Sequence, residues 1–214
     1  MTPESASKQL LEVARKAPVI PVLVIDDAGR ARDLAEALVA GGLFALEITL
    51  RTPQALDAIR AMADVPGAII GAGTILTPDD ASRAMDAGAT FAVSPGSTDT
   101  LLDACEAANF PMLPGIATCS EGMHLLARGY SFMKFFPAEA NGGVPALKGI
   151  GAPLPQITFC PTGGVSLANA QSYLDLSNTV CVGGSWVAPK DMVNSGDWEG
   201  ITKLASEASK LIAR

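Results

Sequence analysis

A lysine interrupts an apolar segment of the sequence, at position 134 of the run FMKFFP. Alternate residues of a strand face the same side, so Lys134 shares a face with Phe132 and Phe136. Burial of an ammonium group is costly and favours the free amine, which can attack a ketone to form a Schiff base. The alternative is a lysine whose charged end reaches the rim and pairs with a carboxylate such as Glu47 or Glu139.

A glutamate and an arginine share one face of a second expected strand, residues 43–50 and the position that follows it. Period-two alternation places Leu46 and Ile48 on the apolar face, and Glu47 and Arg51 on the opposite face. An acid and a base would then point toward the interior and the mouth of the fold. A structural Glu–Arg ion pair is the alternative, because buried charges are usually paired.

Two glycine pairs follow the last two expected strands, at 163–164 and 183–184. Loops after the late strands of a barrel often bind phosphate through backbone N–H groups, and glycine allows the backbone to approach the anion. One such pair is a weak signal, because Gly-Gly is common in turns. Two pairs in consecutive loops predict an anion site, with Ser185 beside the second. Thr74, at the end of a third strand, also stands at the mouth, unless it is a helix cap or a simple turn.

Strand-like and helix-like segments alternate along the chain and would position these residues. The expected strands cover residues 19–24, 43–50, 68–72, 91–94, 112–115, 132–136, 156–161 and 180–182. Each is followed by a helical pattern, and a small helix precedes the first strand. This order predicts a single (β/α)8 TIM barrel with a short N-terminal helix, and residues 1–214 as one domain. The alternative fold is an open doubly wound sheet, which normally has a glycine-rich loop after its first strand.

Composition narrows the possible functions. The chain has 214 residues, a formal net charge of −7 and no cluster of lysine and arginine, which argues against nucleic acid as a partner. Runs of about 18 apolar residues are absent, as is a signal-peptide pattern, so we expect a cytoplasmic protein without a membrane partner. His124 is the single histidine, which disfavours zinc and most His-based triads. The four cysteines are isolated and typical of buried thiols.

Several short motifs together resemble one known family, the class I 2-dehydro-3-deoxy-phosphogluconate (KDPG) aldolases. The motifs are LEITLRT at 46–52, GAGT at 71–74, SPG at 94–96, LPG at 113–115, KFFPAE at 134–139, PTGGV at 161–165 and GGSW at 183–186. Each is modest alone, but the ordered set, from about residue 19 to 190, is highly specific. The resemblance implies cleavage of KDPG to pyruvate and glyceraldehyde 3-phosphate in the Entner–Doudoroff pathway, by a homotrimer without a metal or other cofactor.

The resemblance also implies a role for each candidate site residue. Lys134 matches the Schiff-base lysine, and Glu47 matches the general acid/base that moves protons through water. The other matched residues bind the phosphorylated keto acid: Arg51 and Thr74 at the pyruvate carboxylate, Thr162 beside the hydroxylated carbons, and Gly163, Gly164, Gly184 and Ser185 at the phosphate.

Three alternative functions remain open at this point. A related pyruvate lyase could act on 4-hydroxy-2-oxoglutarate or on the C4 epimer, 2-dehydro-3-deoxy-6-phosphogalactonate. A metal-dependent aldolase would need histidine and carboxylate ligands, which a single histidine makes unfavourable. A non-catalytic barrel that binds sugar phosphates would not need a lysine buried in a strand.

Overall fold

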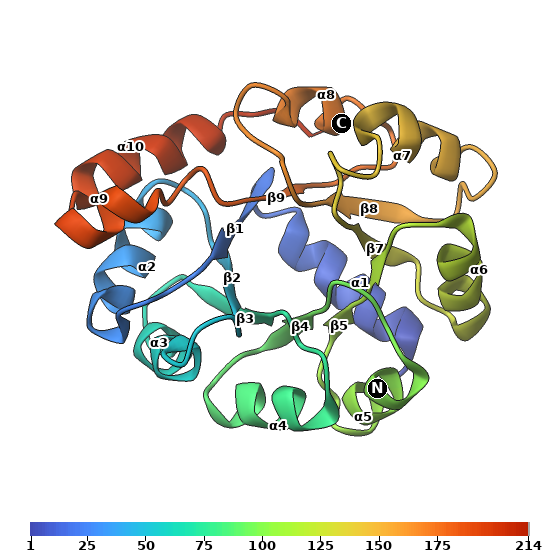
Figure 1. Cartoon of the computed structure of the whole chain (residues 1–214), viewed down its shortest axis with the longest axis horizontal. Helices are drawn as coiled ribbons and strands as arrows, with labels where there is room; N and C mark the ends of the chain where they lie inside the picture. Colours follow the sequence, from blue (N-terminus) through green and yellow to red (C-terminus); the bar gives the residue numbers. More distant parts are fainter. Residues whose placement is uncertain (214) are drawn as a thin grey trace.

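Short parallel strands alternate with helices in the computed structural model, which describes residues 1–213 (Figure 1). The strands in this range are β1 (Val19–Leu23), β2 (Ala45–Thr49), β3 (Ile69–Gly73), β4 (Phe91–Val93), β5 (Met112–Leu113), β6 (Gly115–Ile116), β7 (Phe132–Phe135), β8 (Thr158–Pro161) and β9 (Val182–Gly184). The helices are α1 (Pro3–Ala14), η1 (Ala28–Arg30), α2 (Ala31–Ala40), α3 (Ala55–Ala63), α4 (Pro78–Asp86), α5 (Asp99–Ala107), α6 (Cys119–Arg128), α7 (Gly143–Gly151), α8 (Ala170–Leu174), α9 (Lys190–Ser195) and α10 (Trp198–Ala208). The predicted alternation is confirmed; the short helix α9 is an addition that the sequence analysis did not predict.

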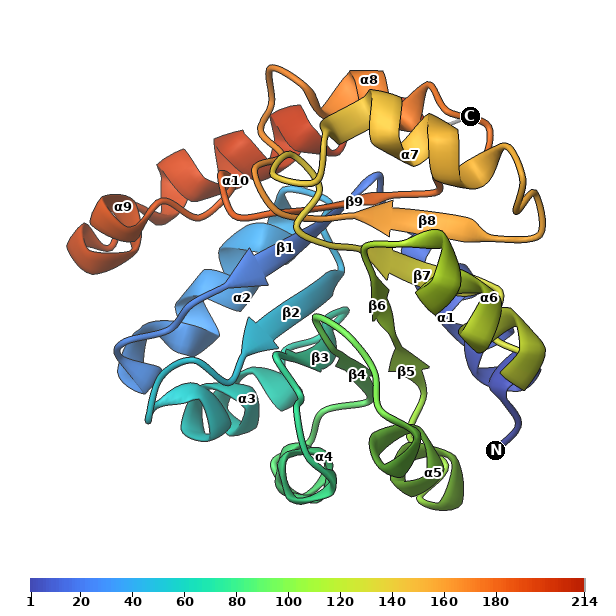
Figure 2. The ribbon, with the colours of Figure 1, turned by 45° about the vertical axis from the view of Figure 1, so that its right-hand side comes forward.

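Strand pairing within residues 1–213 gives two curled parallel sheets (Figure 2). The first has the order β5-β4-β3-β2-β1-β9 and the second β6-β7-β8. Pro114, which has no N–H for the ladder, separates β5 from β6, so the single strand expected at 112–115 is split. Isolated parallel bridges, Phe159 to Thr179 and Thr162 to Gly183, connect β8 with the β9 segment. The coarser α/β prediction is confirmed, and the closed eight-stranded ring stays a prediction.

The alternation of side chains along the strands separates two apolar regions. Leu46 and Ile48 of β2 belong to the large core between the strands and the helices. Ala45 of β2 belongs to a second cluster inside the curled sheets, which also contains Phe132 of β7. The period-two assignment of β2 and β7 is therefore confirmed. Leu10 and Ala14 of α1 join the interior cluster, so this helix packs against the interior and covers it on one side.

Helix ends follow local signals in the sequence. Thr77 caps α4 by accepting from Asp80 N, and the Asp80 carboxylate accepts from Thr77 N in return. This capping box confirms the helix start expected at that position.

Within residues 1–213, no helix is long and apolar enough to cross a membrane.

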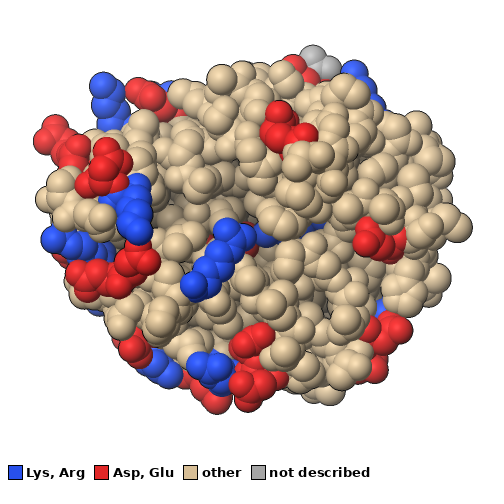
Figure 3. All heavy atoms as spheres, in the orientation of Figure 1, with Lys and Arg blue, Asp and Glu red and all other residues tan. Residues whose placement is uncertain are grey.

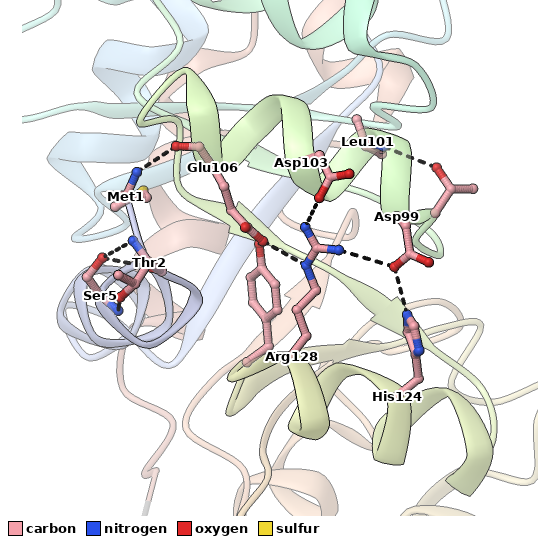
Figure 4. A network of polar contacts seen from close by, with 11 residues as sticks. Met1, Thr2, Ser5, Asp99, Leu101, Asp103, Glu106, His124 and Arg128 are labelled. Atoms are coloured by element: carbon pink, nitrogen blue, oxygen red, sulfur yellow. Dashed lines mark hydrogen bonds and ion pairs between the residues drawn. The ribbon is translucent and has the colours of Figure 1, made fainter.

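Arg128, at the end of α6, joins α5 and α6 through three carboxylates (Figure 4). Its Nε lies 2.9 Å from Glu106 and its Nη1 lies 3.2 Å from Asp99, while Nη2 contacts Asp103. His124 lies on the surface of the same helix, with its Nε2 3.0 Å from Asp99. The ion pairs connect α5 with α6, and the exposed His124 side chain takes part in the same network.

We expect Arg128→Ala to lower the free energy of unfolding by about 1–3 kcal/mol, because it leaves three carboxylates close together without their cation. Urea unfolding at neutral pH measures this change. Arg60→Ala is the matched control, because Arg60 pairs with a single carboxylate, Asp57, and both side chains are more than half exposed. That control should cost no more than about 0.5 kcal/mol. If the two variants lost equal free energy of unfolding, the Arg128 network would not stabilise the contact between α5 and α6.

Candidate active site

The polar residues singled out in the sequence gather where the parallel strands end. Parallel strands bring their carboxyl ends to one side of a sheet, so residues at the ends of β2, β3, β7, β8 and β9 meet there. On the face shown in Figure 3, a basic side chain crosses the hollow at the centre, and most other charged side chains, of both signs, lie toward the edge. The hollow thus holds basic atoms on a chain whose net charge is −7.

A lysine and a glutamate form a buried ion pair between β7 and β2. Lys134 Nζ lies 3.2 Å from Glu47 Oε1, and each residue is 3% exposed. Among residues 1–213, these two are the charged side chains that are buried. The partner of Lys134 is thus Glu47 and not Glu139, and the ammonium group does not reach out to the rim. At this distance a proton can pass directly between amine and carboxylate.

The aromatic ring of Phe136 and the backbone of the neighbouring strand hold the lysine in place. Lys134 Nζ lies 5.2 Å from the centroid of the Phe136 ring, within the range of a cation–π contact. Its backbone N–H donates to Pro114 O at 2.9 Å. Because both ends of the residue are fixed, the amine has a defined direction of approach.

Two thiols lie on the interior face beside the ion pair. Cys160 of β8 is the register partner of Lys134, and Cys160 and Cys181 both belong to the interior cluster. Hydrogen bonding with Cys160, followed by burial, raises the pKa of the Cys181 thiol well above its usual value. The Cys181 thiol keeps its proton at neutral pH, so it adds no negative charge beside Glu47.

Arg51 and Thr74 form a second contact closer to solvent. Arg51 is exposed, and its Nε donates to Thr74 Oγ1 at 3.3 Å. The Glu–Arg alternative is therefore wrong, because Glu47 pairs with Lys134. Thr74 has φ +60°, a left-handed backbone that β-branched residues rarely adopt. Strain of this kind concentrates at functional sites, where the surrounding structure enforces it.

We expect Thr74→Gly to leave the free energy of unfolding unchanged or to raise it by about 1 kcal/mol. It releases strain of about 1–3 kcal/mol, partly offset by the greater chain entropy of glycine. Asn109→Gly is the control: Asn109 has φ +55° just after α5, and because asparagine adopts this backbone more readily than threonine, the variant should gain less stability. A clear loss of stability in Thr74→Gly would show that the backbone at Thr74 is not strained.

The glycine loops after β8 and β9 lie side by side. The bridge between Thr162 and Gly183 joins them. Gly163 and Gly164 have φ +100° and +78°, conformations that favour glycine. Within residues 1–213, the N–H groups of Gly164 and Ser185 have no intramolecular acceptor. Such N–H groups are the donors that an anion requires.

Glu139 supports the first of these loops. Its backbone N–H donates to Gly163 O at 3.0 Å, and a Cβ on Gly164 would lie 2.6 Å from Glu139 Cβ. The Glu139 side chain accepts a hydrogen bond from Tyr173 OH. Burial, followed by this bond, raises the pKa of Tyr173, which therefore stays a neutral donor. Glu139 thus has a structural role in holding the loop.

The second loop and Thr162 are closely packed. A Cβ on Gly184 would lie 1.8 Å from the Trp186 ring, so the indole occupies the space where a side chain would stand. Thr162 is 4% exposed, and a Cβ on Gly183 would lie 2.3 Å from its Oγ1. Ser185 is exposed at the loop tip. The structure therefore brings Thr162 and the loop glycines together at one place.

Sequence reasoning missed the contacts that interior glycines make. Gly73 leaves the space in which Glu47 lies, and Gly183 does the same for Thr162. The available signal was the GAG spacing at 71–73, because glycine inside a strand marks a close approach by a neighbour. The pattern along this segment alone predicts a strand end and a turn.

A buried lysine paired with a carboxylate, beside an exposed arginine and two glycine loops at the same strand ends, is an arrangement that suits a Schiff-base lyase of the aldolase class. The KDPG and KHG aldolase family model matches residues 10–204. The chain is 53% identical over 198 residues to the 2-dehydro-3-deoxy-phosphogluconate aldolase of Pseudoalteromonas atlantica, covering 92% of each chain. The chain belongs to the KDPG and KHG aldolase family, and it is a carbon–carbon lyase.

Two solved structures are similar over nearly the whole chain. The KDPG aldolase of Zymomonas mobilis with 3-phosphoglycerate is 48% identical, with a TM-score of 0.92, covering 96% of this chain and 97% of that chain. The KDPG aldolase of Legionella pneumophila, with pyruvate captured as a covalent carbinolamine, is 46% identical with a TM-score of 0.90, covering 94% and 98%. The resemblance found in the sequence motifs is thereby confirmed.

Proposed function

We propose that this chain is a class I aldolase that cleaves KDPG to pyruvate and glyceraldehyde 3-phosphate in the Entner–Doudoroff pathway. The observation that carries the proposal is the buried amine of Lys134, 3.2 Å from the Glu47 carboxylate. The covalent carbinolamine in the Legionella relative supports it. The test is turnover of KDPG, followed as pyruvate release in a coupled assay; failure to release pyruvate would overturn the proposal.

The reaction starts at the C2 ketone of the substrate. Glu47 takes a proton from the Lys134 ammonium, and the free amine adds to C2 to give a carbinolamine. Glu47 returns a proton to the departing hydroxyl, which leaves as water, and a protonated imine remains. This imine accepts electrons, so the reaction needs no metal or other cofactor in our scheme.

The same carboxylate then opens the carbon–carbon bond. Glu47 accepts the C4 hydroxyl proton through a water, the C3–C4 bond breaks and its electrons move into the imine to form an enamine. Glyceraldehyde 3-phosphate leaves. Protonation of the enamine at C3 and hydrolysis of the imine release pyruvate and restore the amine of Lys134.

The remaining site residues bind the substrate in this proposal. Arg51 and Thr74 hold the pyruvate carboxylate, with the guanidinium oriented by its bond to Thr74. Thr162 contacts the hydroxylated carbons and influences which C4 configuration reacts. The phosphate lies against the loops that contain Gly163, Gly164, Gly184 and Ser185, with the N–H groups of Gly164 and Ser185 and the Ser185 hydroxyl as donors.

We also propose that the two sheets close into a single (β/α)8 TIM barrel over residues 1–214. The bridges between β8 and the β9 segment, together with the continuation of β5 into β6 across Pro114, support this closure. We further propose one domain, a homotrimer and a cytoplasmic location. Sedimentation of the full chain tests the trimer.

We expect Ser185→Ala to raise the KM for KDPG about tenfold, because a hydroxyl bound to a charged phosphate contributes about 1.5–3 kcal/mol. The KM for 4-hydroxy-2-oxoglutarate, which has no phosphate, should change much less. Ser185→Thr keeps the hydroxyl and serves as the control. Gly184→Val is a poorer test, since the added side chain would displace Trp186. Equal losses on both substrates would contradict the phosphate assignment.

A second candidate is a pyruvate lyase acting on 4-hydroxy-2-oxoglutarate (KHG) or on the phosphogalactonate epimer. The family description includes KHG, which favours the first of these two substrates. The anion loops favour a phosphorylated substrate but do not determine the C4 configuration. Comparison of kcat/KM for the two epimers and for 4-hydroxy-2-oxoglutarate distinguishes the candidates. A non-catalytic sugar-phosphate binder would show no pyruvate release from any of them.

A further inference from the structure

The interior face of β3 carries two glycines, and each leaves room for a side chain of a neighbouring strand. A Cβ on Gly71 would lie 2.2 Å from the Phe91 ring. A Cβ on Gly73 would lie 2.2 Å from Glu47 Oε1 and 2.7 Å from Glu47 Cγ. Real Cβ atoms do not approach heavy atoms this closely. Alanine at Gly73 therefore requires the Glu47 side chain to move.

The register shows how Glu47 comes to lie over Gly73. Glu47 is the partner of Gly71, and Thr49 is the partner of Gly73. The Glu47 side chain therefore leans along the strand toward its carboxyl end, over the next inward-facing position of β3. The Phe91 ring fills the space over Gly71, the register partner of Glu47, so the Glu47 side chain does not lie straight across from its own position. Gly73 leaves free the place that the carboxylate takes instead.

We infer that Gly73 is a positioning residue that holds the Glu47 carboxylate within reach of Lys134. The inference rests on the proposed function, in which this carboxylate moves the protons of the carbinolamine and cleavage steps. Gly73 does not have a positive φ, so the requirement for glycine here comes from the close approach of Glu47 and not from backbone strain. A displacement of about 1 Å in such a group can lower a rate about a hundredfold.

Gly73→Ala should lower kcat at least about tenfold and change KM much less, because in the proposed function Arg51, Thr74 and the glycine loops hold the substrate, whereas Glu47 moves protons. Exchange of the pyruvate methyl protons with deuterated solvent should slow by a similar factor. Gly41→Ala is the matched control: its Cβ would meet Ala205 Cβ at 2.4 Å, at the contact between α2 and α10. That variant should lose stability without a specific loss of kcat. Equal kcat values for the two variants would overturn the inference.

A stability cycle tests the contact independently of catalysis. If the Glu47 side chain is what Gly73→Ala meets, the substitution should lower the unfolding midpoint in the parent and much less in a Lys134→Met/Glu47→Ala background, which leaves no unpaired buried lysine. Adding Gly73→Ala to that background should cost little further stability, even if Gly73→Ala alone does not fold. An equal drop in both backgrounds would overturn the inference. If the parent enzyme released no pyruvate, the proposed function would be overturned. The stability measurements could still be interpreted, because they do not depend on activity.

Discussion

Lys134→Ala should abolish cleavage, with kcat lowered at least about 10⁴-fold, because no other group in the site can form the imine. The substitution also leaves Glu47 as a buried carboxylate without its partner, which costs about 3–5 kcal/mol of folding free energy. A stability loss is thus expected along with the loss of activity. Stopped assays of pyruvate release, together with circular dichroism at the assay temperature, measure the two effects separately.

A double variant separates the chemistry from the folding. Lys134→Met/Glu47→Gln replaces both charges with neutral groups of similar size, so it should recover much of the stability lost in Lys134→Ala. It should remain inactive, since it lacks the amine. Substantial cleavage by either variant in its folded state would rule out Lys134 as the nucleophile.

Glu47→Gln should lower kcat by about 10²–10⁴, the range expected when a general acid/base is removed. Glutamine has nearly the shape of glutamate and can still hydrogen-bond to Lys134, but it cannot accept the proton. KM should change less than kcat, and adduct formation with pyruvate should survive in part. Steady-state kinetics with KDPG and a single-turnover measurement of adduct formation distinguish these steps.

Asp26→Asn is the control for Glu47→Gln. Asp26 follows β1 and pairs with Lys190 at 2.6 Å, so its substitution also removes a carboxylate near a strand end. We expect kcat within about twofold of the parent, because this carboxylate pairs with Lys190 rather than Lys134. A near-normal kcat for Glu47→Gln would reduce Glu47 to a structural partner of the lysine.

Period and chemical type along single strands were enough to predict where the reactive side chains point. Alternation in β2 assigned Glu47 to the interior, and the apolar setting of Lys134 made burial one of two interpretations, the other being a lysine that reaches the rim; both residues are 3% exposed. The capping signal at Thr77 likewise predicted the start of α4. Strand alternation and helix capping are set by residues that are close in the sequence, so they can be predicted from it.

Contacts between distant segments were less predictable. Lys134 and Glu47 are 87 positions apart, and the sequence also left Glu139 open as a partner of Lys134 and Arg51 as a partner of Glu47. The positive φ of Thr74 opposes its local preference and is imposed by the surrounding fold. The need for glycine at position 73 comes from the Glu47 side chain of a neighbouring strand. Only the packed chain defines such relations.

Borohydride reduction of the protein in the presence of pyruvate tests the central claim most directly, because it traps the imine before hydrolysis. We predict that the chain gains the mass of one carboxyethyl group, and that peptide mapping locates it on Lys134. Reduction without pyruvate, and the Lys134→Ala variant with pyruvate, should show no gain. An adduct on any other lysine, or none on the parent protein, would contradict the Schiff-base mechanism.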